Sequence, residues 1–237
     1  QNTFTWSLWI KRGELSALKY FLGFGGTTGL SFNAADSLFL QLSGAAVITT
    51  AAKFRDPTAW LHVVYRQQPG VTELWANGAL VGTSATTSTQ FNTAAAHQLF
   101  AINNALHFHG YMARICHVDG QYLAPSDFAE ANSEGTWISK SQAACKAIVD
   151  GPGNNNFMLD FDTGAALANL GNDFSDNNND WTVGAGFSIT LGANYDWMTD
   201  TPSNNHATLN PLNGVGTIAA GNLSITNINA SYTNYSA

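Results

Sequence analysis

Oxygen-bearing side chains recur at alternate positions between residues 173 and 180. Asp173, Ser175 and Asn177 place a carboxylate, a hydroxyl and an amide in the spacing that loops for hard cations use. The stretch lacks the glycine and the distant glutamate of an EF-hand, which excludes that motif. Two interpretations stay open: a calcium site on these three residues, or a loop whose Asx turns satisfy its own backbone.

Two histidines stand at alternate positions, His107 and His109, and His117 and Asp119 follow them. Alternate side chains of a strand point the same way, so this pair could chelate a transition metal. A third ligand would have to come from the partner strand of a hairpin. The other interpretation is that both imidazoles face solvent or bond to neighbouring side chains, which is the commoner arrangement.

Aromatic rings next to polar side chains are typical of sugar sites, because a ring stacks on sugar C–H groups while amides hold the hydroxyls. Trp9 lies on the otherwise polar face of a predicted strand, and Trp75 precedes Asn77 by two positions. If the chain binds glycan, we expect Trp9, Trp75 and Asn77 to contact it. For Trp9, the alternative is packing beneath a loop.

Strands must position these residues. Alternation of apolar and polar residues predicts extended segments at residues 4–11, 19–24, 29–32, 37–42, 62–66, 72–76, 97–102 and 108–118. Asn77-Gly78 and Asp119-Gly120 are tight-turn dipeptides. Because no amphipathic helices separate the strands, we predict an all-β chain that forms an antiparallel two-sheet sandwich. Its core is expected to contain Trp6, Leu8, Ile10, Trp60, Val63, Leu74, Ile115 and Leu159.

Composition narrows the class of partner. Charged residues make up 11% of the 237 residues, against about 25% in ordinary globular proteins. All nine Lys and Arg lie at or before Lys146, whereas eight of the sixteen acidic residues follow it. An acidic C-terminal third repels phosphates, so we expect no nucleic-acid partner. No apolar run is long enough for a membrane span, so we expect no membrane insertion.

Several stretches resemble a known family. They are FHGYMARICHVDGQYLAPSDF at residues 108–128, FTWSLWIKRG at 4–13 and AWLHVVYRQQPGVTELWANG at 59–78, with NFMLDFD at 156–162 and TDTPSNNHATLNPL at 199–212. The sequences of these stretches resemble the laminin G-like, concanavalin A-like jelly-roll domains of bacteriophage virion proteins. The resemblance implies a jelly-roll sandwich over residues 1–165, with a connecting arm at 133–153 and a returning strand at 154–162. Residues 166–237 are expected to form an extended linker and the start of a further β-domain.

The resemblance also implies a function. It points to a non-enzymatic structural or adhesive part of a phage particle, such as a tail fibre, spike or capsid decoration. Such a part would be a homo-oligomer that contacts other virion proteins and host-surface glycans. The alternative is a carbohydrate-binding module of a secreted bacterial protein, with calcium as its one candidate cofactor.

An enzyme of the same sandwich is the third class considered. Glycoside hydrolysis needs two carboxylates about 5 to 9.5 Å apart. Enzymes with this sandwich usually take these acids from one strand, in the pattern Glu-x-Asp-x-x-Glu. Here only Asp160 and Asp162 match acidic positions of that pattern, and Ala165 stands at the position of the last glutamate. We therefore predict no enzymatic activity.

The segment at residues 167–212 is dense in Asn, Asp and Gly and has few large apolar residues. Such a segment cannot close a core of its own against the entropy of ordering. We expect it to be held by its aromatic residues on its own sandwich, on a downstream domain or on an adjacent subunit. The predicted anchors are Phe174, Trp181, Phe187, Tyr195 and Trp197. Cys116 and Cys145 could pair or remain free thiols, and both outcomes stay open.

Overall fold

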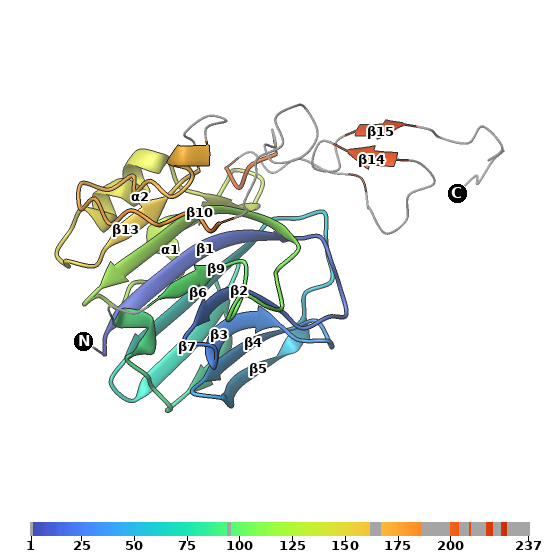
Figure 1. Cartoon of the computed structure of the whole chain (residues 1–237). Coiled ribbons are helices and arrows are strands. Elements are labelled where there is room, and N and C mark those ends of the chain that lie inside the picture. The colour runs from blue at the N-terminus through green and yellow to red at the C-terminus, as the bar shows by residue number, and fades with distance from the viewer. Residues whose placement is uncertain are drawn as a thin grey trace.

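Two antiparallel β-sheets pack face to face in the computed structural model of the chain (Figure 1). The structure describes residues 2–93, 96–161, 167–185, 200–203, 209, 217–219 and 224–226. The predicted all-β, two-sheet antiparallel sandwich is confirmed. None of the helices in the described ranges is long and apolar enough to cross a membrane.

The larger sheet has six strands in the order β13-β10-β1-β6-β7-β8. Their bounds are β1 Phe4–Arg12, β6 Leu61–Gln68, β7 Val71–Ala76, β8 Ala79–Ser84, β10 Gly110–Asp119 and β13 Phe157–Leu159. A returning strand was predicted at residues 154–162, and within that range β13 pairs antiparallel with β10. Strand β1 therefore lies near the centre of the sheet, between β10 and β6.

The second sheet has five strands in the order β5-β4-β3-β2-β9. Their bounds are β2 Lys19–Phe24, β3 Thr28–Phe32, β4 Ser37–Leu42, β5 Ala45–Lys53 and β9 His97–Leu99, and the 3-10 turn η1 Gln90–Asn92 precedes β9. Strand β5 was not predicted, because its many small and exposed residues hide the alternation. The edges β5 and β8 meet closely, and a Cβ at Gly82 would lie 2.3 Å from Ile48 Cγ2.

The main core lies between the sheets. Seven of the eight predicted core residues belong to it, namely Trp6, Leu8, Ile10, Val63, Leu74, Ile115 and Leu159. Trp60 is buried as well, but it belongs to a separate cluster with Trp9 and Ala129. Because side chains alternate along β1, Trp6 faces the core while Trp9 lies on the opposite face of the sheet.

A third layer covers that opposite face. It consists of α1 Pro125–Phe128, β11 Ala129–Ala131, β12 Trp137–Ser139 and α2 Gln142–Val149. The predicted connecting arm thus contains a strand and a helix. Helix α2 begins where Ser141 Oγ accepts a hydrogen bond from Ala144 N, and it buries Cys145 and Val149 against Cys116. Both cysteines are free thiols in this cluster.

The segment at residues 167–212 is called the acidic segment from here on. Its described part lies on the sandwich of its own chain. It includes the 3-10 turn η2 Leu167–Asn169. Phe174 packs on the cluster around α2, and Trp181 packs on the main core. Asp200 forms a buried ion pair with Lys11 on β1, with 2.7 Å between Oδ2 and Nζ. Farther along, β14 Thr217–Ala219 pairs with β15 Ser224–Thr226.

Candidate functional site

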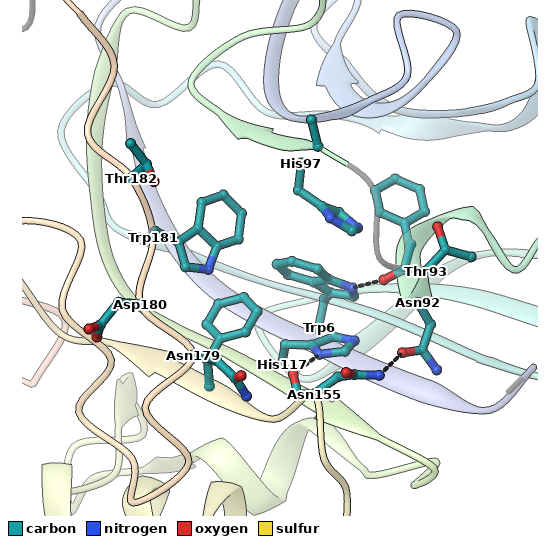
Figure 2. A pocket seen from close by; sticks show the side chains of 13 residues that line it. Trp6, Asn92, Thr93, His97, His117, Asn155, Asn179, Asp180, Trp181 and Thr182 are labelled. Carbon is teal, nitrogen blue, oxygen red and sulfur yellow. Dashed lines mark hydrogen bonds between the residues drawn. The ribbon is translucent and has the colours of Figure 1, made fainter.

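A cavity of about 520 Å³ opens on the side of the sandwich where β9 and β13 are the edge strands. Its lining comes from β1, β10, β13, η1 and β9, together with residues 179–182 of the acidic segment. Figure 2 shows the side chains around it. This volume lies within the 300–1,000 Å³ that is typical of small-molecule sites.

Aromatic rings form much of the lining. Trp6 of β1 is buried, and its ring lies 5.4 Å from Phe157 and 5.9 Å from His97, measured between centroids. Trp181 is half-buried, and its ring lies 5.2 Å from Phe157 and 6.3 Å from His97. Figure 2 shows Trp181, His97 and Trp6 grouped around the cavity. A partly exposed indole in this position offers a flat apolar surface to a ligand.

The position of Trp181 depends on a close backbone contact with Gly171. Trp181 N donates to Gly171 O at 2.7 Å. A Cβ at Gly171 would lie 1.9 Å from Trp181 O, so a side chain there would displace the segment. The preceding residue, Asp180, is fixed by Asp173, whose N–H donates to Asp180 Oδ1. The acidic segment therefore supplies one wall of the cavity.

Three asparagines line the cavity with their amide groups in fixed orientations. The Nδ2 groups of Asn92 and Asn155 both donate to the carboxylate of Asp119, at Oδ1 and Oδ2 respectively. Asn179 Nδ2 donates to the backbone oxygens of Asn154 and Asn156. Since the amide nitrogens are directed to protein acceptors, the amide oxygens of Asn155 and Asn179 remain to accept hydrogen bonds from a ligand.

His117 of β10 lies beneath these groups and is 2% exposed. Its Nδ1 lies 3.0 Å from the carbonyl oxygen of Asn155, so Nδ1 is the protonated nitrogen and donates. The Nε2 atom is buried and has no hydrogen-bond partner among the described residues. Burial lowers the pKa of His117 to about 4. The imidazole is therefore neutral at pH 7, and Nε2 is an acceptor.

The predicted sugar-binding role of Trp9 is wrong. Its side chain is 1% exposed, and its ring stacks on His62 at 4.7 Å beneath the β11–β12 layer. Packing beneath a covering segment, the alternative for Trp9, is what the structure has.

Trp75 and Asn77 lie away from the cavity, on β7 and in the turn after it. Trp75 Nε1 donates to Glu73, and the guanidinium of Arg66 covers the indole at 4.9 Å. Asn77 accepts from His62 N through Oδ1. The structure does not bring these two residues together with the cavity lining, and their role as glycan contacts stays a prediction.

Asp173, the first predicted calcium ligand, has its carboxylate occupied. Oδ1 accepts from Met158 N and Ser175 N, and Oδ2 accepts from Ser175 Oγ and Asn179 N. Asn177 Nδ2 donates to Val149 O and Ser175 Oγ. These bonds match the Asx-turn loop that was the alternative, and a calcium ion at Asp173 would have to displace them.

The other candidate metal and carboxylate residues are dispersed. His109 Nδ1 lies 2.6 Å from Glu14, ahead of β10, and no cluster of metal-binding side chains occurs within the described residues. Asp160 pairs with Arg114. Asp162 lies outside the described residues. Within the described lining of the cavity, Asp180 is the one carboxylate.

Two of the five predicted anchor residues can be placed. Phe174 and Trp181 hold the acidic segment on its own sandwich, which was the first of the three predicted supports. Phe187, Tyr195 and Trp197 lie outside the described residues.

Residues 1–118 match a laminin G-type family model described as the concanavalin A-like lectin/glucanases superfamily. This match bears out the predicted concanavalin A-like fold, and residues 1–118 are similar to laminin G-type domains. A search of curated proteins found no match.

Solved structures with a similar fold include a candidate carbohydrate binding protein from Bacteroides ovatus, with 14% identity and a TM-score of 0.47 over 70% of this chain and 47% of that one. Domain 4 of an extracellular arabinanase from Geobacillus stearothermophilus, solved with arabinotriose, is 19% identical with a TM-score of 0.43 over 53% of this chain and 64% of that one. A heptameric pentraxin from Limulus polyphemus is 13% identical with a TM-score of 0.41, over 59% and 80% of the two chains. The chain thus spans about half of the Bacteroides protein.

Proposed function

We propose that this concanavalin A-like domain binds glycan in the cavity between the β9 and β13 edges. The observation that supports the proposal is the lining itself, which combines a half-buried indole with amide oxygens and an unpartnered imidazole nitrogen. A sugar ring has an apolar C–H face and a rim of hydroxyls, and these need a ring to stack on and fixed polar atoms to bond.

Each part of the lining has a role in this proposal. Trp181 stacks on the sugar face, and the amide oxygens of Asn155 and Asn179 accept from hydroxyls. His117 Nε2 accepts from the hydroxyl that reaches deepest. A hydroxyl that fills this position removes the cost of an unsatisfied buried polar atom, which favours the bound state.

The proposed activity is binding without hydrolysis. The described lining has one carboxylate, Asp180, and that side chain already accepts a hydrogen bond from Asp173 N. Acid–base hydrolysis of a glycosidic bond uses two carboxylates. The virion setting and the homo-oligomer expected from the sequence stay predictions, and glycan binding in this cavity does not depend on either.

A glycan array with three forms of the full chain tests the proposal. We expect the wild-type chain to bind a set of the immobilised glycans and the Trp181→Ala variant not to bind them, because the stacking surface is removed. The Trp75→Ala variant lacks an indole on β7 outside the cavity and should bind the same set as the wild-type chain. Unchanged retention by Trp181→Ala at an unchanged unfolding midpoint would refute the site, and loss in Trp75→Ala alone would place binding on β7.

A further inference from the structure

The hydrogen bonds inside the cavity limit the chemistry of its ligand. The amide N–H groups of Asn155 and Asn179 are directed to protein oxygens, and the N–H of His117 is directed to the Asn155 carbonyl. What these three side chains offer a ligand is a set of acceptors: two amide oxygens and the buried Nε2 atom of a neutral imidazole. Acceptors bind hydroxyl and N–H donors, and they repel groups that can only accept.

Charge around the cavity acts in the same direction. Asp180 stands exposed in the lining, and the buried carboxylate of Asp119 lies behind Asn92 and Asn155. All nine Lys and Arg residues belong to the described part of the chain, and none of them lines the cavity. A carboxylate or sulfate in this cavity would therefore lie near the carboxylates of Asp119 and Asp180, with no lysine or arginine in the lining to pair with it.

On this basis we infer that the cavity selects sugars by charge: it accepts neutral and amino sugars and rejects uronic acids and sulfated sugars. The inference rests on the proposed glycan binding and adds the class of ligand. An ammonium group suits the site because it carries three donors and a positive charge. The ionised carboxylate of a uronic acid has neither hydrogen-bond donors nor a positive charge.

The test uses sugars that share one ring configuration, and each derivative differs from the neutral parent sugar at a single position. Each set contains the neutral sugar, its 2-amino derivative and its uronic acid, and dissociation constants are measured by calorimetry for sets that contain an array ligand. We expect the uronic acid to bind at least about tenfold more weakly than the neutral sugar, and the amino sugar to bind no more weakly than it. The difference should shrink as salt is raised, because salt screens the exposed Asp180.

Two single-charge variants form the matched pair. Asp180→Asn removes a charge at the cavity while keeping an oxygen that can accept from Asp173 N. It should therefore reduce the gap, meaning the ratio between the dissociation constants of the acidic and the neutral sugar. Asp176→Asn removes the same charge at a site that pairs with Lys146 away from the cavity, and it should leave the gap unchanged.

The outcomes separate the two proposals. An acidic sugar that binds through Trp181 as tightly as its neutral counterpart overturns the charge selection and leaves glycan binding intact. A wild-type chain that retains no glycan overturns both.

Discussion

His117 and His62 are both buried, and each is hydrogen-bonded as the neutral imidazole. His62 lies between Trp137 Nε1, which donates to Nδ1 at 3.1 Å, and Ser7 Oγ, 2.8 Å from Nε2. Burial lowers the pKa of His62 to about 3 and that of His117 to about 4. An unfolded histidine has a pKa near 6.5, so below that pH the unfolded chain binds more protons than the folded one.

The free energy of unfolding should therefore fall as the pH falls from about 6.5 to about 4, by roughly 1 kcal/mol per pH unit for each buried histidine. Above pH 6.5 these two groups should have no effect. Urea unfolding at pH 7, 5.5 and 4.5 measures this slope. His62→Gln should reduce this slope; a slope equal to that of the wild-type chain would contradict the prediction.

Asp173 leads to a prediction about calcium. Its two oxygens accept four hydrogen bonds, three from backbone N–H groups and one from Ser175 Oγ. A carboxylate has about four lone-pair sites, so none is left for a cation. We expect EDTA and millimolar calcium to leave the thermal unfolding midpoint unchanged. A rise of several degrees with calcium that is lost in Asp173→Asn would show that the loop binds the ion.

The positions of the tryptophans Trp6, Trp9 and Trp181 can be predicted from the sequence only in part. Alternation places Trp6 and Trp9 on opposite faces of β1, and this was predicted correctly. It does not reveal that a later segment covers Trp9 while Trp181 stays half exposed, because burial depends on contacts between residues far apart in the chain. The signal that could have identified Trp181 is a single indole among Asn and Asp residues, a pattern that by itself predicts only an anchor.

At the scale of elements, the wall of the cavity depends on residues 167–185. Gly171 touches Trp181 O, and a methyl group there would lie 1.9 Å from that oxygen. Gly171→Ala should therefore move the Trp181 wall and weaken glycan binding by about tenfold or more. The effect on the main core should be small, because the contact lies outside the two sheets.

Gly184→Ala is the matched control for this variant. A Cβ at Gly184 meets nothing within 4 Å, so binding should not change. Calorimetric titration with an array ligand, together with urea unfolding, separates a moved wall from a destabilised sandwich. Full affinity in Gly171→Ala would show that the wall does not position the ligand.

The strands were more predictable than the layer outside them. Residues 4–11 and 108–118 alternate strongly because one face meets the core, so β1 and β10 could be predicted from periodicity. Residues 133–153 are mostly small and polar, and few of them make apolar contacts: Cys145, Ile148 and Val149 on α2 and Trp137 on β12. A short helix with two buried residues has no distinctive pattern, so the arm appeared featureless in sequence.

At the scale of the whole molecule, one side of the sandwich is closed and the other is completed by the acidic segment. The edges β5 and β8 pack directly at Ile48 and Gly82, whereas Trp181 lies against Phe157 of β13 and near His97 of β9. The fold follows from hydrophobic alternation. The site follows from a segment far along the chain that returns to this side, and no local pattern encodes that return.

The central claim is that glycan binds at this side of the sandwich. The most direct measurement is a titration of the nitrogen-15-labelled chain with an array ligand, monitored by NMR through the indole N–H signals of its seven tryptophans. The Trp181→Ala and Trp75→Ala variants assign the two decisive signals. The account predicts that the Trp181 signal shifts in a saturable way while the Trp75 signal does not move. A saturable shift at Trp75 with an unmoved Trp181 signal would contradict it.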